Sequence, residues 1–272
     1  MTSDPFELHV VGCGTANYHA VQQLCRSDRA PDVTRMTFTD YQRVGPENAL
    51  TCPDYAGHEG QSKAAVLAVK AVEWMDGRLP QIEVYPFREE DLDWARILPE
   101  RPDGGLAFVL AGLDDWTARL HVCDDVRLRR DACPASRAVI IQIGLDKGLA
   151  SLAVFNNTWD SPCPACGLAR LPNPEPCIAL AANGDLLRGD LRTEAAEAGK
   201  VALDVIADLA SRAPARGWLN TKTQVAVGGR AGAPSVLRQT RPCVAQAGCW
   251  GSHYSRGPTR WASSLEPLSA FL

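Results

Sequence analysis

The first half of the chain alternates between short apolar runs and longer segments with apolar residues at helical spacing. Apolar runs of strand length cover residues 7–11, 35–39, 81–85, 107–111, 138–143 and 149–155. Helical spacing covers residues 15–24, 62–74, 89–97 and 115–129. Strands that alternate with helices are typical of a parallel sheet with helices on both faces. The pattern therefore predicts an α/β fold.

The pattern changes after the fifth of these runs. A turn at residues 144–148 joins two β-type runs, which indicates that the sheet continues with antiparallel pairing. Residues 158–175 are rich in Pro and Cys and are expected to form a surface excursion. An amphipathic helix capped by Thr193 is expected at residues 194–211. Two strands should follow at residues 218–227 and 235–241, and a tail at residues 256–272.

Composition and charge narrow the class of protein. The chain has 272 residues, a formal net charge of −4 and 46% hydrophobic residues, which is normal for a soluble globular protein. Its Lys and Arg residues are scattered, so we expect no nucleic-acid partner, and its most apolar uncharged stretch, residues 104–113, is too short to span a membrane. The start has neither a basic leader nor a long apolar segment, so we expect a cytoplasmic protein in a reducing compartment. The ten cysteines therefore need a role other than disulfides.

A glycine turn stands between the first strand and the first helix. Gly12 and Gly14 lie there, where glycines let a phosphate approach the backbone and the helix N-terminus attracts negative charge. Asp40 ends the second strand, where a carboxylate can accept hydrogen bonds from a ribose. Asn17 takes the place of a third glycine. The alternative is that the glycines only make a tight turn and Asp40 caps a loop. A nucleotide site is the better hypothesis, and an NAD-dependent oxidoreductase would share it.

The segments after Asp40 are more specific. Residues 39–48 read Thr-Asp-Tyr-Gln-Arg-Val-Gly-Pro-Glu-Asn, residues 60–64 read Gly-Gln-Ser-Lys-Ala, and residues 114–119 read Asp-Asp-Trp-Thr-Ala-Arg. Together they resemble the ThiF/MoeB/HesA family of ubiquitin-activating-enzyme-like adenylyltransferases. In that family an Asp ends the second strand, an Asn follows, Gly-x-x-Lys-Ala opens the next helix, and an acidic motif with an Arg follows the fourth strand.

The resemblance implies a nucleotidyltransferase with a Rossmann-like fold. ATP would adenylate the C-terminal carboxylate of a small ubiquitin-like β-grasp partner, for sulfur transfer or conjugation, and the chain would form a homodimer or heterodimer. Asp40 would hold the ribose, Gly12 and Gly14 the phosphate region, Asn48 and Lys63 the phosphate oxygens, and Asp114 a Mg²⁺ ion, with Arg119 as a further cofactor-binding residue.

Three of these residues also have alternative interpretations. Lys63 lies in the first turn of a helix, where the helix dipole disfavours a cation, so a phosphate explains it better than solvent does. Asp115 is the expected N-cap of the next helix, which leaves Asp114 for the metal. Arg119 lies four residues beyond Asp115, so it could form an ordinary ion pair with that residue instead.

The cysteines divide into three groups. Cys163 and Cys166 form a Cys-Pro-Ala-Cys knuckle, and with Cys243 and Cys249 they predict a structural Zn²⁺ site, with a redox Cys-x-x-Cys pair as the alternative. Cys177 lies among prolines in a loop, and the resemblance implies that it can act as a nucleophile toward the activated partner. The other five are expected to be buried packing residues: Cys13, Cys25, Cys52, Cys123 and Cys133.

Three departures from the family pattern leave other functions open. Thr51 stands where the family usually has an Arg, Gln42 stands where it commonly has a second Asp, and the first strand begins too early for the family's N-terminal helix. Arg43 is a candidate substitute for the missing Arg. Alternatively, the chain could be an ATP-binding, non-catalytic subunit of a heterodimeric activating complex. An NAD-dependent oxidoreductase, or a zinc-stabilised interaction module without nucleotide, is the remaining hypothesis.

These observations predict one Rossmann-like domain with a mixed sheet, mostly parallel and then antiparallel, a zinc knuckle and a small β-rich C-terminal extension. Residues 1–157 would form the ATP-binding half, residues 158–255 the knuckle, helix and last strands, and residues 256–272 the tail.

Overall fold

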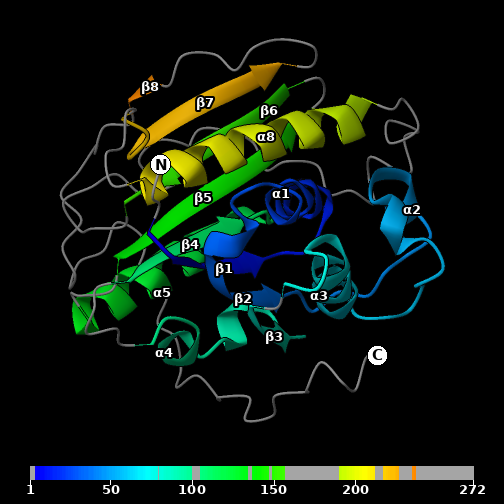
Figure 1. Cartoon of the computed structure of the whole chain (residues 1–272), viewed down its shortest axis with the longest axis horizontal. Coiled ribbons are helices and arrows are strands. Elements are labelled where there is room, and N and C mark those ends of the chain that lie inside the picture. The colour runs from blue at the N-terminus through cyan, green and yellow to red at the C-terminus, as the bar shows by residue number, and fades with distance from the viewer. Residues whose placement is uncertain are drawn as a thin grey trace.

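A computed structural model describes residues 4–78, 80–99, 105–133, 137–146, 149–156, 190–211, 217–226 and 235–236. Within these ranges the fold is a sheet with helices on both faces (Figure 1). The strands are β1 (Phe6–Val11), β2 (Val33–Thr39), β3 (Gln81–Tyr85), β4 (Leu106–Ala111), β5 (Arg137–Asp146), β6 (Leu149–Phe155), β7 (Thr221–Ala226) and β8 (Ser235–Val236). The helices are α1 (Thr15–Cys25), α2 (Asn48–Thr51), α3 (Lys63–Trp74), α4 (Trp94–Ile97), α5 (Trp116–Ala132) and α8 (Asp190–Ala210). Short 3-10 turns lie at Ala30–Asp32, Pro53–Tyr55 and Glu89–Asp91.

Among the described residues, eight strands form one sheet in the order β3-β2-β1-β4-β5-β6-β7-β8. Strands β1 to β5 pair in parallel, whereas β6, β7 and β8 pair in antiparallel fashion, beginning with Ile140 opposite Phe155. This confirms the predicted α/β fold and the change of pairing after the fifth strand. The order reverses between β1 and β4, and such a switch point opens a crevice at the carboxyl ends of the strands.

Both faces of the sheet are buried. Along β4, Phe108 and Leu110 pack on the side of α1, α3 and α8, and Val109 and Ala111 pack on the side of α4 and α5. Because side chains alternate along a strand, two apolar layers require a continuous apolar run, which is why β4 reads as one in the sequence. The helices thus hold the parallel strands rigidly and fix the positions of their carboxyl ends.

Helix α8 joins the later part of the chain to this core. It lies beside α1 (Figure 1), where a Cβ on Gly199 would be 3.0 Å from the backbone nitrogen of Ala20. It also contacts β5, β6 and β7. A glycine at this point lets the two helix backbones approach closely. The proposed boundary between residues 157 and 158 stays a prediction.

Three element predictions were wrong in detail. The helix expected over residues 89–97 is a 3-10 turn followed by α4, because Leu92 is extended and the Asp93 carboxylate caps a new helix by accepting from the Ala95 and Arg96 N–H groups. Helix α8 begins at Asp190, so Thr193 lies inside it and is not its cap. Strand β7 begins at Thr221 because residues 219–220 form a turn with Asn220 at φ 58°.

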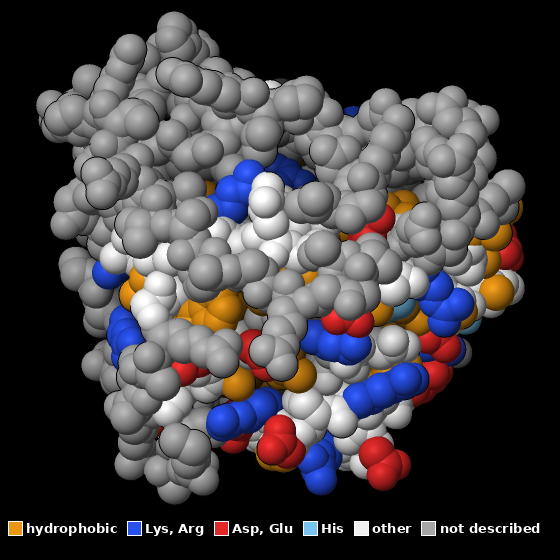
Figure 2. All heavy atoms as spheres, turned by 90° about the horizontal axis from the view of Figure 1, so that it is seen from above, with side chains coloured by type: hydrophobic (Ala, Val, Ile, Leu, Met, Phe, Trp, Pro, Cys, Tyr) orange, Lys and Arg blue, Asp and Glu red, His pale blue; other side chains and the backbone are white. Residues whose placement is uncertain are grey.

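Charged side chains are mixed on the surface. On the face seen from above in Figure 2, basic and acidic side chains alternate over the described part of the surface. None of the helices in the described ranges is long and apolar enough to cross a membrane. Residues 158–189, which include the predicted knuckle, and the tail at 256–272 lie outside the described residues.

Candidate functional site

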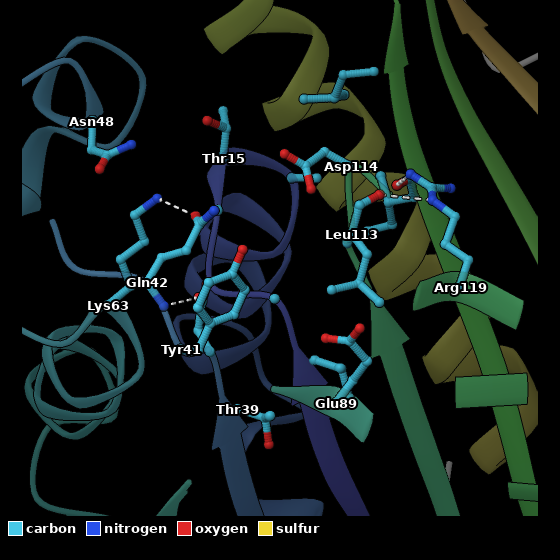
Figure 3. Close-up of a pocket in the computed structure, with 18 of the residues that line it drawn as sticks. Thr15, Thr39, Tyr41, Gln42, Asn48, Lys63, Glu89, Leu113, Asp114 and Arg119 are labelled. Carbon is cyan, nitrogen blue, oxygen red and sulfur yellow. Dashed lines mark hydrogen bonds between the residues drawn. The ribbon is translucent and has the colours of Figure 1, made fainter. Parts of the chain in front are cut away.

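A cavity of about 360 Å³ opens at the switch point, at the carboxyl ends of β1, β2 and β4 (Figure 3). All seven residues predicted to hold nucleotide or Mg²⁺ and lying in the described ranges contribute to its wall: Gly12, Gly14, Asp40, Asn48, Lys63, Asp114 and Arg119. Figure 3 shows Lys63 and Asn48 on one side and Asp114 and Arg119 on the other. The fold therefore brings together residues that are far apart in the sequence, at the place where α/β sheets bind ligands.

The two glycines of the first turn serve different needs. Gly12 has φ +83°, and a Cβ there would lie 2.7 Å from the carbonyl oxygen of Gly112, so only glycine fits. Gly14 caps α1 with φ −83°, and a Cβ there would meet no described atom within 4 Å. The absence of a side chain at Gly14 therefore keeps the cavity open beside the N-terminus of α1.

Asn17 has a structural role that the sequence did not reveal. Its side chain is fully buried, and its Nδ2 donates to the carbonyl oxygens of Val11 at 3.0 Å, Gly12 at 2.7 Å and Leu110 at 3.1 Å. The amide ties the end of β1 to the end of β4. Asn17 stands at the position of the third glycine of the dinucleotide-binding pattern, and its side chain forms a hydrogen bond across the switch point.

The peptide between the two glycines is held from both sides. The Cys13 N–H donates to Asp40 Oδ2 at 2.7 Å, and the Cys13 carbonyl accepts from the Tyr55 hydroxyl at 2.6 Å. The other Asp40 oxygen accepts from the Gln42 N–H at 2.7 Å. Burial raises the pKa of Asp40, while the two N–H groups and the Lys63 charge oppose the rise. Asp40 thus caps two loops, as the alternative interpretation held, and its role toward ribose stays a prediction.

The opposite wall of the cavity carries the two residues that we expect to donate to phosphate. Lys63 is the first residue of α3, and its ammonium donates to Gln42 Oε1 at 2.9 Å. The Asn48 side-chain oxygen accepts from the Gly45 N–H at 2.8 Å, which leaves its NH₂ group as the donor. Both side chains are buried, so their orientation is fixed by packing.

The loop after β4 supplies an acid and a cation. Asp115 caps α5 by accepting from the Ala118 N–H at 2.8 Å, as the sequence indicates, and Asp114 is exposed in the wall of the cavity. The alternative interpretation of Arg119, an ion pair with Asp115, is wrong. Arg119 instead donates to the carbonyl oxygens of Leu113 at 2.7 Å and Ile143 at 3.1 Å. Burial lowers the pKa of Arg119 to about 10, and the Asp114 charge opposes that shift.

The departures from the family pattern have a structural explanation at Thr51. Its hydroxyl lies 2.7 Å from that of Thr15, and the side chain is buried and is not among the residues that line the cavity. Arg43 does line the cavity, and its guanidinium donates to the Gly60 carbonyl at 2.7 Å. Arg43 therefore brings a cation to the cavity wall, and its role as a substitute for the missing Arg stays a prediction.

Two aromatic residues that the sequence pattern did not indicate, Tyr41 and Phe87, line the cavity. Tyr41 is 49% exposed, and the Arg88 guanidinium lies over its ring at 4.4 Å. Leu113 also lines the cavity. The adjacency of Tyr41 to Asp40 was the signal available, because residues at strand ends face the same crevice.

The described cysteines and acids set limits on metal binding. Five cysteines in the described ranges are buried, which confirms the packing prediction: Cys13, Cys25, Cys52, Cys123 and Cys133. The predicted zinc ligands Cys163, Cys166, Cys243 and Cys249, and the predicted nucleophile Cys177, lie outside the described residues. Within the described part of the chain, no group of three or more His, Cys, Asp or Glu side chains is arranged to hold a metal. The single Asp114 carboxylate does fit Mg²⁺, which proteins hold through one or two carboxylates together with phosphates.

Solved structures share this fold. E. coli MccB with AMPCPP and MccA has a TM-score of 0.60 at 13% identity, covering 88% of this chain and 66% of its own. E. coli MccB with ATP has a TM-score of 0.57 at 14% identity, covering 88% of this chain and 65% of its own. PaaA has a TM-score of 0.58 at 10% identity, covering 85% of this chain and 64% of its own. The chain thus spans slightly less than two thirds of the length of these neighbours.

Sequence comparison adds no relative. No protein-family model and no curated protein matches the chain. The likeness to MccB and PaaA, at identities of 10–14%, therefore establishes the fold, which is a Rossmann-like α/β fold with a parallel and then antiparallel sheet.

Proposed function

We propose that this chain binds ATP in the cavity and transfers the adenylyl group to a carboxylate of a polypeptide partner. The observation that carries the proposal is that all seven residues predicted to bind nucleotide or Mg²⁺ line one cavity at the switch point. The cavity volume of about 360 Å³ suits a small ligand. The shared fold supports the same ligand class, since MccB was crystallised with ATP and, in another structure, with AMPCPP and MccA together.

In the proposed reaction, a carboxylate oxygen of the partner attacks the α-phosphorus of ATP. The bond from that phosphorus to the bridging oxygen breaks, and pyrophosphate leaves with the electron pair. The open space at Gly14 and the N-terminus of α1 accommodate phosphate, and Lys63 and Asn48 donate to its oxygens from the opposite wall. Such chemistry needs positioning and charge neutralisation more than covalent help.

The loop after β4 completes the site. Asp114 would hold a Mg²⁺ ion, which neutralises phosphate charge when it is bound. Arg119 supports this loop, because it bonds the Leu113 carbonyl directly before Asp114 and joins it to the end of β5. Its remaining N–H groups are the donors available to a bound phosphate.

Two kinds of polypeptide partner fit the proposal. The family resemblance favours a small β-grasp protein whose product serves sulfur transfer or conjugation, with Cys177 as a candidate acceptor. The MccB structures that contain MccA favour a shorter peptide-like substrate. Dimer formation and a structural zinc at the four-cysteine site belong to the same proposal.

A specific observation favours a second function. Thr51 stands where the resemblance implies an Arg, and it does not line the described cavity wall, so this position supplies no cation there. An ATP-binding, non-catalytic subunit of a heterodimer would tolerate that loss. The oxidoreductase alternative gains no support, since no histidine lines the described part of the cavity wall.

Pyrophosphate exchange distinguishes these functions. Purified chain, ATP, Mg²⁺ and labelled pyrophosphate are incubated with candidate small partner proteins or peptides encoded next to the gene. Partner-dependent incorporation of label into ATP is expected, and Asp114→Asn should reduce it strongly. Tight ATP binding without exchange, for every partner tried, would favour the non-catalytic subunit. Binding of NADH in preference to ATP would overturn both.

A further inference from the structure

The cation in the cavity wall has a neutral partner. The Lys63 ammonium donates to the Gln42 carboxamide oxygen at 2.9 Å, and the Lys63 backbone N–H donates to the Gln42 carbonyl at 3.0 Å. Lys63 is only 7% exposed and is the first residue of α3, where the helix dipole opposes a positive charge. An ammonium group in this setting is costly unless an anion compensates it.

Among the described residues, neither Asp40 nor Glu47 forms a hydrogen bond with the Lys63 ammonium. Both Asp40 oxygens accept backbone N–H groups, from Cys13 and from Gln42. The Lys63 charge opposes the rise that burial causes in the pKa of Asp40, so the two groups interact, but the carboxylate is oriented by the backbone. Glu47 also lines the cavity and lies beside Gly45. The contact that orients the ammonium is therefore the uncharged amide.

We propose that Gln42 is a positioning residue that holds Lys63 toward the cavity while leaving its charge available to a polyphosphate. A carboxylate at position 42 would make the same hydrogen bond but would neutralise the cation. This inference rests on the proposed ATP site and concerns how that site attracts phosphate.

The two departures from the family pattern balance in charge. An acid is lost at Gln42 and a cation is lost at Thr51, so the formal charge of the site changes by +1 − 1 = 0. The Lys63 ammonium thus has an uncharged hydrogen-bond partner at the position where the resemblance implies an acid. Lys63 can therefore attract phosphate although Thr51 is not among the residues that line the cavity.

The test compares two substitutions at position 42. Gln42→Glu keeps the size and the hydrogen bond, whereas Gln42→Leu removes the hydrogen bond without adding charge. Binding of ATP, inorganic pyrophosphate and adenosine is measured by calorimetry in the full chain. We expect Gln42→Glu to weaken the binding of ATP and pyrophosphate by about tenfold or more, and Gln42→Leu to weaken it less. Adenosine should bind with the same affinity to the wild type and to both variants.

A purely structural role predicts the opposite order. If Gln42 only packs against Lys63, Gln42→Glu should bind pyrophosphate as tightly as the wild type and Gln42→Leu should be the weaker variant. That order would overturn the inference, as would a wild-type chain that binds neither ATP nor pyrophosphate. In a Lys63→Met background the effect of Gln42→Glu should largely disappear, because the charge that it neutralises is gone.

Two controls test whether the effect is local to the cavity and whether each variant folds. Gln61→Glu adds the same charge at an exposed side chain outside the cavity wall, and it should leave pyrophosphate binding within about twofold of wild type. Thermal unfolding without ligand checks that each variant folds. Failure of pyrophosphate exchange, with the expected order of binding intact, would overturn the adenylation proposal and support the role of Gln42.

Discussion

At the scale of single residues, the turn before α1 shows that two glycines one residue apart can be needed for different reasons. The backbone at Gly12 is left-handed and touches the Gly112 carbonyl, so its side chain is excluded by the protein itself. Gly14 has ordinary backbone angles and open space beside it. Gly12 is therefore needed for the stability of the fold, whereas Gly14 is needed to leave room for a ligand.

This difference predicts opposite phenotypes. Gly14→Val should unfold at nearly the wild-type temperature but bind ATP at least about tenfold more weakly, because its side chain occupies the phosphate space. Gly12→Ala should lose about 2 kcal/mol or more of unfolding free energy, from the positive φ and the 2.7 Å contact. Urea unfolding and ATP titration of both variants measure this, and normal ATP binding by Gly14→Val would contradict it.

Tyr55 provides a second prediction at this scale. Tyr55→Phe removes the hydroxyl that holds the Cys13 carbonyl and should cost about 1 kcal/mol of stability. It should also weaken ATP binding, since the turn is no longer held in place. Tyr18→Phe is the matched control, because that hydroxyl bonds Asp54 and does not touch the turn. Equal ATP affinities of the two variants would show that the Cys13 contact has no part in binding.

At the scale of elements, β1, β2 and β3 share a polar layer on the side of α4. His9 is fully buried, with its Nδ1 2.9 Å from the Thr37 hydroxyl and its Nε2 3.4 Å from Glu7. Arg35 bonds Glu83 at 3.0 Å and the carbonyl of Ile97 at 2.9 Å. Burial is the largest effect on His9 and lowers its pKa, although Glu7 opposes the shift.

This layer predicts a pH dependence of stability. Since the folded pKa of His9 is lowered, the unfolded chain binds more protons as the pH falls through its value near 6.5, so stability falls. Between about pH 7.5 and 5.5, a window above the ordinary pKa values of Asp and Glu, the His9→Gln variant should lose less unfolding free energy than the wild type. His19, whose pKa burial also lowers, accounts for part of the remaining slope. Urea unfolding at both pH values tests this, and an unchanged slope would contradict it.

Helices and strands were predicted correctly where their cause lies within a few residues of the sequence. The β4 run and the Asp115 cap were predictable, because continuous burial and capping leave a signal within a few residues. The prediction of one helix over residues 89–97 was wrong, because the apolar residues follow helical spacing although Asp93 caps a separate helix within the segment. Spacing alone does not show where the chain is extended.

At the scale of the whole molecule, the predicted zinc site would connect two distant parts of the chain. Cys163 and Cys166 would share one ion with Cys243 and Cys249. We expect about one zinc per chain in the purified protein by elemental analysis, and Cys243→Ser to lose it and to unfold at a lower temperature. Cys25→Ser, at a buried packing cysteine, should retain the metal. Metal-free wild-type protein would rule out the site.

By itself, the sequence determined the α/β class, the change to antiparallel pairing, the residues that gather at the cavity and the burial of five cysteines. These depend on periodicity and on the rule that parallel strands present their carboxyl ends together. Only the tertiary structure decided that Asp40 and Tyr55 hold the glycine turn, that Arg119 bonds two carbonyls, and that Gln42 orients Lys63. Those contacts join segments far apart in the chain, and their distances depend on how strands and loops pack, which no local pattern encodes.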